Sequence, residues 1–379
     1  ATLEQENAAY SAQADQLEQL PWVYLGLFLM ALALMLMAKF AMWNEDWNGA
    51  LVPLQALEEL YGDFNKGNYP LAETQWRYKN PAESIFEIQH AWSLTGTQYN
   101  GNVAAIMMPT HNGDGVFDGV PLKGYGTSMP GWSSLRANNR YAIFRPATGN
   151  TQTENAAYVG IVTERVALFN PLPLTYDTYD ATLNRYTVKI DREALAAGEI
   201  RGQKIDRRVQ YFLGLGDLEA GETFKITHNY GVPWPGPKFW CPDIEQNYDS
   251  NNYRIFRYAD AILMMAECYC NLENAEETMR YLNMVRQRAG VDPVTNFTGF
   301  EDLTLAVRCE RARELGGEFQ RKFDLVRWGI WYDQTYAYTN NATLKGKMRP
   351  CHRYYPIPDA QCALSGYVLT NDEYLADGL

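Results

Sequence analysis

The chain has 379 residues, 46% of them hydrophobic and 21% charged, which are the proportions of a folded protein and exclude a disordered one. Its net charge of -12 argues against a nucleic-acid protein, which needs basic residues to neutralise phosphates, and against adhesion to anionic membranes by charge. The charge suits neutral or cationic ligands. The length allows two or three domains, or one large composite domain. Aromatic residues are abundant, with 10 Trp, 26 Tyr and 15 Phe.

The first distinctive segment is an uncharged run at residues 20–38. Its length is that of a membrane span. Pro21 and Gly26 interrupt it, however, and the apolar pattern continues past Lys39. Ala31, Ala38 and the later Ala41 fall on one helical face, as expected where another helix packs closely. We therefore expect a buried helix in the middle of a helical stack, and a membrane span is the alternative.

A second helix is predicted at residues 50–61, after a turn at residues 44–49. Leucines recur there at helical spacing, and Gly62 and Gly67 follow the pattern. Two antiparallel helices joined by a short turn form a hairpin of the tetratricopeptide kind. One such hairpin is too little to establish a repeat.

Residues 79–250 differ from what precedes them, because Gly, Pro, Asn, Thr and Tyr dominate and long amphipathic patterns fade. Short strand-like runs occur at residues 84–88 and 223–226. The segment is too long to be one linker, so we interpret it as a loop-rich subdomain. Loops on a rigid scaffold commonly carry binding function.

Helical patterns return near residue 252. We expect helices at residues 258–270, 275–289 and 301–315. Asn274 has the residue type of an N-cap for the second, and Gly290 that of its C-terminal stop. The chain after Trp331 is expected to be irregular and aromatic.

The sequence shows no pattern typical of a metal, cofactor or catalytic site. The six cysteines form no CxxC pair and suggest buried thiols, with one disulfide as an alternative. Residues 111–119 resemble a calcium loop, but their acidic spacing fails the twelve-residue pattern, and we expect a tight turn. The histidines are scattered, without HExxH or a triad signature. We therefore expect no metal, no cofactor and no catalytic residues.

Three stretches of the carboxy-terminal third stand out: NYRIFRYADAILMMAE (252–267), LNMVRQRAG (282–290), and RCERAREL (308–315) continuing through EFQRKFDLVRWG (318–329). Together, in this order and spacing, they closely resemble the signature of the SusD/RagB family. The sequence YPIP (355–358) resembles the family's closing strand. Weaker similarities lie at residues 80–88 and 238–240, the entry to and exit from the loop-rich region. The family usually has more helix before residue 25, so the amino-terminal part looks shortened.

The resemblance implies a mainly α fold, with a tetratricopeptide-like helical hairpin scaffold and a large loop-rich subdomain containing short strands. We divide the chain into an amino-terminal helical part (1–78), the loop-rich ligand-binding subdomain (79–250), the carboxy-terminal helical signature region (251–345) and an irregular tail (346–379). The implied protein is an outer-membrane nutrient-binding lipoprotein. It would capture an oligosaccharide at the extracellular face and deliver it to a TonB-dependent transporter of the SusC type. Any lipid anchor would lie upstream of Ala1.

Charged residues dominate the signature, and their spacing suggests ion pairs along and between helices. A pair of carboxylates could alternatively serve glycoside hydrolysis, but the arginines crowded around them would lower their pKa values and make poor general acids. We interpret the set as structural rather than as the ligand site: Arg257, Glu267, Arg286, Glu310, Arg311, Glu314, Arg321, Asp324, Arg327 and Trp328.

Glycan binding needs flat apolar faces for sugar rings, with amides and carboxylates to pair the hydroxyls. The loop-rich region offers such residues among its glycines: Trp92, Tyr99, Asn100, Asn102, Tyr125, Trp132, Tyr230, Trp234 and Trp240. Alternatively, each aromatic covers the scaffold beneath a long loop.

Three other functions remain open at this stage. A peptide receptor of the same family is the alternative nearest to a glycan receptor, and the acidic balance favours basic peptides. A glycan-active enzyme and a helical-repeat adaptor without a small ligand are the others.

Overall fold

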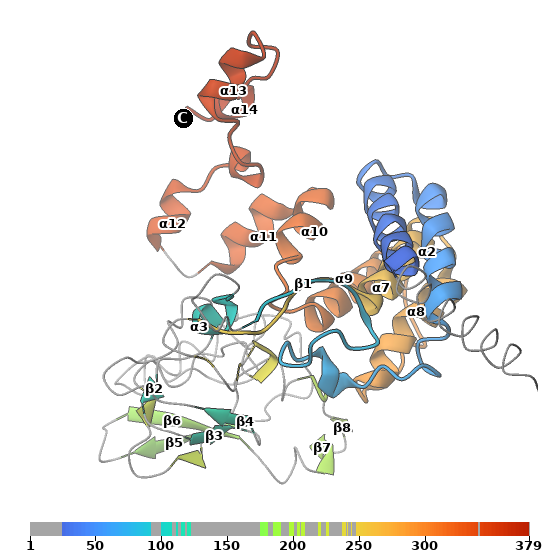
Figure 1. Ribbon diagram of the computed structural model, residues 1–379, viewed down its shortest axis with the longest axis vertical. Helices are drawn as coiled ribbons and strands as arrows, with labels where there is room; N and C mark the ends of the chain where they lie inside the picture. Colours follow the sequence, from blue (N-terminus) through green and yellow to red (C-terminus); the bar gives the residue numbers. More distant parts are fainter. Residues whose placement is uncertain are drawn as a thin grey trace, which may run out of the picture.

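The computed structural model describes most of both helical parts and shorter pieces between them (Figure 1). The described residues are 25–91, 100–107, 111–112, 115–117, 120–122, 175–180, 185–190, 197–200, 203–204, 206–208, 219–220, 225–226, 237–239, 241, 244, 248–339 and 342–378. The fold is mainly helical with short strands, which confirms the predicted fold class.

The predicted helix hairpin is present at the amino-terminal end. Its first helix is Leu25–Trp43 and its second, α2, is Trp47–Tyr61. The turn is shorter than predicted, because Asp46 caps α2 by accepting a hydrogen bond from the Gly49 backbone N–H at 2.8 Å. The helix therefore begins inside the stretch expected to be a turn.

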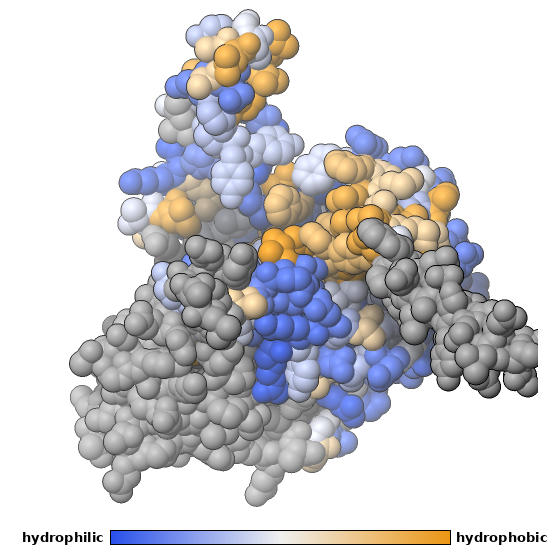
Figure 2. Space-filling model, in the orientation of Figure 1, coloured by the Kyte–Doolittle hydropathy of each residue, from blue (hydrophilic) through white to orange (hydrophobic). Residues whose placement is uncertain are grey.

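The helix Leu25–Trp43 buries only one face. Ala31, Met35, Ala38 and Met42 are buried in the core, so the small-residue face does pack closely. The prediction of a helix buried all round is wrong, because its other face stays exposed, with Phe40 68% exposed. Figure 2 shows an apolar patch over this helix pair. By length and composition the helix could cross a membrane, and 22% of its apolar window is buried in the protein.

Three helices of the carboxy-terminal part form the centre of the fold. They are α7 (Tyr258–Asn271), α8 (Ala275–Arg288) and α9 (Phe300–Glu314), each within one residue of its predicted bounds. Helix α7 packs against α2, α8 and α9, which explains why nearly all of its residues are buried. Asn274 accepts from the Glu277 backbone N–H as the predicted N-cap, and Gly290 follows α8 with a φ of +74°.

A pair of strands joins the loop-rich region to this scaffold. Strand β1 (Ser84–Ile88) has the predicted bounds and pairs antiparallel with β11 (Tyr253–Arg257), which leads directly into α7. Strand β1 lies near the beginning of the loop-rich region in sequence, and β11 follows directly after its end. The beginning and end of that region therefore meet at one place on the scaffold.

Within residues 79–250 the described elements are short. Helix α3 is Val103–Met107 and the 3-10 helix η3 is Pro237–Phe239, while the 3-10 helix η1 (Leu71–Thr74) lies just before this region. Strand β2 (His111–Asn112) pairs with β10 (Lys225–Ile226), and β3 (Gly115–Phe117) pairs with both β4 (Val120–Leu122) and β9 (Glu219–Ala220). Two further strand pairs form between sequence neighbours. They are β5 (Thr175–Asp180) with β6 (Arg185–Ile190), and β7 (Glu199–Ile200) with β8 (Gln203–Lys204). Two of these pairings join residues 111–122 to residues 219–226.

The chain after α9 is more regular than predicted. Helix α10 (Arg321–Arg327) is followed, in the stretch expected to be irregular, by α11 (Trp331–Tyr338) and α12 (Ala342–Lys347). The tail then contains the 3-10 helix η4 (Pro350–Arg353), α13 (Asp359–Leu364) and α14 (Asp372–Ala376). The closing strand expected at residues 355–358 is not a strand. Asn371 instead holds this segment, donating to the Ile357 carbonyl and accepting from the Ile357 N–H. Single turns fixed by such local bonds leave little periodicity in a sequence.

All six cysteines lie in described residues, and all six are buried thiols outside any disulfide. The prediction of buried thiols is confirmed, and the alternative of a disulfide is not. Burial raises the pKa values of the Cys268 and Cys270 thiols, so neither is activated as a nucleophile.

Candidate functional site

The centre of the scaffold is a buried network of charges rather than a cleft. Arg257 stands at the end of β11, where its guanidinium donates to Glu83 Oε1 at 2.8 Å and Glu314 Oε1 at 2.7 Å. It also forms a bidentate pair with Glu318, with Nε and Nη2 each about 3 Å from a carboxylate oxygen. Arg288 pairs with both Glu83 and Glu314 from α8. The network thus connects β11, α8, α9 and the chain before β1.

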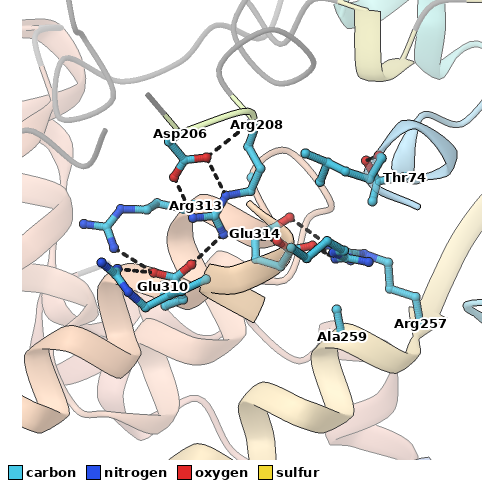
Figure 3. A network of polar contacts seen from close by, with 12 residues as sticks. Thr74, Asp206, Arg208, Arg257, Ala259, Glu310, Arg313 and Glu314 are labelled. Carbon is cyan, nitrogen blue, oxygen red and sulfur yellow. Dashed lines mark hydrogen bonds and ion pairs between the residues drawn. The ribbon is translucent and has the colours of Figure 1, made fainter. Parts of the chain in front are cut away.

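Two cations of the loop-rich region enter the same network. Arg208 is fully buried and pairs with Asp206 at 2.6 Å on one side and with Glu310 at 2.6 Å and Glu314 at 3.1 Å on the other (Figure 3). Lys238 donates to Glu318 Oε1 at 2.5 Å and to the Gly316 carbonyl at 2.9 Å. Burial lowers the pKa of Lys238 to about 8, although Glu318 opposes that shift. These contacts fix two points of the loop-rich region on α9 and the turn that follows it.

A second set of pairs joins the helices to one another. Arg311 on α9 contacts Asp260 at 2.9 Å and binds Asp324 through Nε and Nη2, and Lys39 also reaches Asp260 at 2.7 Å. Glu267 accepts from both Nη atoms of Arg327 and from the indole N–H of Trp328. The positions predicted to form ion pairs therefore do so across three helices.

The carboxylates of the network are held in the ionised form. Burial alone would raise the pKa of Glu314, but the guanidinium groups of Arg288, Arg257 and Arg208 outweigh it and hold that pKa well below its ordinary value. The same balance of burial against arginine charge lowers the pKa values of Glu83, Glu310 and Glu318. A carboxyl group in this state is a poor general acid at neutral pH.

The remaining predicted signature residues lie at the edges of the network. Arg286 pairs with Glu310 at 3.0 Å and also donates to the Asp292 carbonyl. Arg321 donates to the Arg308 carbonyl and lies over the Trp328 ring. Sequence reasoning missed Glu83, Arg208 and Lys238 as members. Glu83 and Lys238 lie in the weak similarities at residues 80–88 and 238–240, which fix no partner, and no pattern in the sequence marked Arg208.

A polar clamp closes the base of the loop-rich region. Gly101 and Asp249 pair through reciprocal backbone hydrogen bonds of 2.8 and 3.0 Å, and Asp249 Oδ2 also accepts from the Ala104 N–H. His90 joins the clamp, since its N–H donates to Asn252 Oδ1 at 3.0 Å and its Nδ1 lies 2.7 Å from the Asn251 carbonyl. Beneath it, the Trp76 ring meets those of Phe239 and Tyr253 edge-on.

Two of the predicted ligand residues lie in described parts, and both are beside this clamp. Asn100 precedes Gly101, and the amide nitrogen and oxygen of its side chain are buried without a hydrogen-bond partner. Asn102 is exposed, and its carbonyl accepts from the Ile106 N–H at the start of α3. The other predicted ligand residues lie outside the described residues: Trp92, Tyr99, Tyr125, Trp132, Tyr230, Trp234 and Trp240. Among the described residues, no group of His, Cys, Asp and Glu could hold a metal ion.

Comparison with known proteins identifies the family that the carboxy-terminal part resembles. The model of the SusD family matches residues 242–374, which contain β11, α7, α8, α9 and the members of the buried network that these elements carry. Residues 242–374 are a SusD-family region. The resemblance to the SusD/RagB family predicted from the signature is thereby confirmed.

Named relatives extend this result. SusD-like protein P25 of Formosa agariphila is 34% identical over 150 residues, which cover 36% of this chain and 27% of that protein. Surface glycan-binding protein A from Bacteroides uniformis shares the fold, with a TM-score of 0.51 at 20% identity over 90% of this chain and 60% of that one. A SusD superfamily protein from Parabacteroides distasonis gives a TM-score of 0.50 at 17% identity over 89% of this chain and 61% of its own. The chain thus spans less than two thirds of each relative's length.

Proposed function

We propose that this protein is a glycan receptor of the bacterial cell surface. In this proposal the loop-rich region captures an oligosaccharide, and the protein delivers it to a TonB-dependent transporter of the SusC type. A lipid anchor upstream of Ala1 holds the protein at the outer membrane. The observation that carries the proposal is the SusD-family region at residues 242–374, on a fold shared with a protein named for surface glycan binding.

The clamp supports a ligand site on the loop-rich region. It holds Gly101 against Asp249, so the two ends of the region start from one rigid base. Several predicted ligand residues adjoin described members of this base in sequence: Trp92 follows His90 by two positions, and Trp240 follows Phe239. Asn100 offers an amide donor and acceptor whose hydrogen-bonding capacity is unused, which is the complement of a sugar hydroxyl.

We propose binding without catalysis. The carboxylates of Glu83, Glu310, Glu314 and Glu318 are buried, paired with cations and low in pKa, which suits a structural role. A glycoside hydrolase instead needs one carboxyl group with a raised pKa facing a second across an open cleft. Any release of reducing ends from a bound glycan by purified protein would contradict this part of the proposal.

The test is a glycan array followed by isothermal titration calorimetry with the best ligand. We expect Trp92→Ala, Trp240→Ala and Asn100→Ala each to weaken binding at least tenfold. The matched control is Trp331→Ala, a tryptophan on α11 far from the clamp in sequence, which should bind as the unaltered protein does. Equal affinity in all four variants would overturn the assignment of the ligand residues.

A peptide receptor is the second candidate, and the net charge of -12 is the observation that favours it. An acidic protein attracts basic peptides over a distance of about one Debye length, roughly 8 Å at physiological salt. Screening the same protein against a library of basic peptides separates the two. Peptide binding that is abolished by 0.5 M NaCl, with no response on the glycan array, would replace the glycan proposal.

A further inference from the structure

A small cavity lies among the helices of the scaffold, apart from the loop-rich region. Its volume is about 140 Å³, well below the roughly 300–1,000 Å³ of a pocket that encloses a drug-sized ligand. Glu45 lies in the turn before α2 and Trp47 is the first residue of α2, while α7 contributes Glu267 and Asn271 and α9 contributes Arg308. Arg327 at the end of α10 and the following Trp328 close the cavity. All of these residues are described.

Arg308 is unlike the arginines of the buried network. Its guanidinium lies over the Trp328 ring, 4.8 Å from the centroid, and it has no hydrogen bond or ion pair with any described side chain. Glu267, the buried carboxylate nearest in the cavity wall, already accepts two bonds from Arg327 and one from the Trp328 indole. The N–H donors of the half-buried Arg308 are therefore available to a ligand.

Positive charge gathers around Trp328. The guanidinium carbons of Arg308, Arg321 and Arg327 lie 4.8, 5.2 and 5.7 Å from the centre of its ring. Burial lowers the pKa of Arg308, and the charges of Arg327 and Arg321 lower it further against the pull of Glu267. An anion bound beside Arg308 would relieve this repulsion.

We propose that this cavity is a second binding site, which takes one carboxylate group of a small polar ligand through the guanidinium of Arg308. A planar carboxylate matches the two parallel N–H groups of an arginine. The four charged side chains that line the cavity have no net charge together, because the carboxylates of Glu45 and Glu267 offset the guanidinium groups of Arg308 and Arg327. A monoanion is therefore accommodated better than a doubly charged phosphate. Trp47 and Asn271 supply an apolar wall and an amide for the rest of the ligand.

Two sources of such a carboxylate are a sugar acid and an amino-acid terminus, and calorimetry separates them. The probes are glucuronate, N-acetylglycine as a carboxylate without a sugar ring, and glucose as a ring without a carboxylate. We expect glucuronate to bind, glucose to give no heat, and Arg308→Gln to weaken glucuronate binding at least tenfold. Binding of N-acetylglycine as tight as that of glucuronate would assign the site to carboxylates in general, and weaker binding would assign it to sugar acids.

The matched control is Arg280→Gln on α8. Arg280 also lies over an aromatic ring, 3.9 Å from the centre of Tyr281, but it pairs with Glu277 and lines no part of the cavity. It should bind glucuronate as the unaltered protein does. Arg308→Lys, which keeps the charge and loses the planar fork, should give intermediate affinity and provides a folded variant should Arg308→Gln fail to fold.

The proposal is overturned by glucose binding as well as glucuronate, by no glucuronate binding at all, or by equal losses in the Arg280 and Arg308 variants. It stands apart from the glycan site on the loop-rich region. Arg308→Gln should leave the affinity for the best oligosaccharide from the glycan array unchanged. Failure of either site therefore leaves the other testable in the same protein.

Discussion

Arg257 and Arg308 contribute charge to two neighbouring regions of the helical part in different ways. In the buried network, Arg257 is fully buried and faces the carboxylates of Glu83, Glu314 and Glu318. At the cavity, Arg308 is half-buried and faces an aromatic ring and two other arginines. The guanidinium donors of Arg257 are matched by acceptors within the protein, whereas those of Arg308 have no partner among the described side chains.

The difference separates stability from binding. A buried charge with every partner in place costs little in the folded state, but it becomes expensive as soon as one partner is removed. A partly solvated arginine without a carboxylate contributes little to stability, and its unused donors are available to a ligand. The SusD-family region therefore contains charged residues that stabilise the fold and, as we propose, an arginine that binds a ligand, within a few turns of helix.

The largest expected effect is on the network. Arg257→Met should lower the free energy of unfolding by roughly 3–5 kcal/mol, because it leaves three buried carboxylates short of a cation. Urea denaturation followed by circular dichroism measures this. Arg280→Met removes an arginine from partly exposed pairs with Glu58 and Glu277 and should cost less than about 1 kcal/mol. Equal costs would show that the network does not stabilise the fold.

The amino-terminal helix allows the same comparison for apolar residues. Met35 is fully buried against the core, whereas Met37, two positions later, is 58% exposed. Met35→Ala should cost about 2–4 kcal/mol through lost burial and an unfilled cavity. Met37→Ala should change stability by less than about 0.5 kcal/mol in solution. Similar losses at both positions would mean that another surface covers the exposed face.

Much of the scaffold could be predicted from the sequence because its signals are local. The periodicity and caps placed α7, α8 and α9 within a residue, and strand β1 was predicted with its observed bounds. The sequence indicated that the charged residues form ion pairs, but it did not indicate which residue pairs with which. Arg208 and Lys238 come from segments with no helical pattern, and their partners on α9 and in the turn after it lie 76 to 106 residues away.

Burial was harder to predict than helix formation. The segment Leu25–Trp43 and helix α7 are both rich in apolar residues, yet α7 packs against three helices and is almost entirely buried, whereas only one face of the first helix is buried. Composition reports that a surface can be buried, and only the arrangement of neighbours decides whether it is. The candidate site shows the same limit, since Asn100 and Asn102 were chosen for their residue type and the clamp beside them depends on Asp249, Asn251 and Asn252.

Acid should weaken the network by a smaller and gradual amount. The pKa values of Glu83, Glu310, Glu314 and Glu318 are lowered in the folded state, so the unfolded chain takes up protons first as the pH falls. The stability they contribute is fully present above about pH 5 and is lost as the pH falls through the folded pKa values. Thermal denaturation across this range measures it.

A matched pair of variants assigns the acid effect to the network. Glu314→Gln removes a buried group that titrates and should flatten the acid dependence of the melting temperature. Glu301→Gln, on the exposed first turn of α9, should leave that dependence unchanged. Identical acid profiles in both variants would place the effect elsewhere.

The smallest expected effect is the stability change of Arg308→Gln. The substitution breaks no ion pair to a described carboxylate and loses a stacking contact with Trp328 worth roughly 0.5–1 kcal/mol. It also removes repulsion with Arg321 and Arg327, which offsets part of that loss. We therefore expect a change below about 1 kcal/mol by urea denaturation, together with the loss of glucuronate binding. A destabilisation near that of Arg257→Met would place Arg308 within the structural network, and the distinction between the two regions would no longer hold.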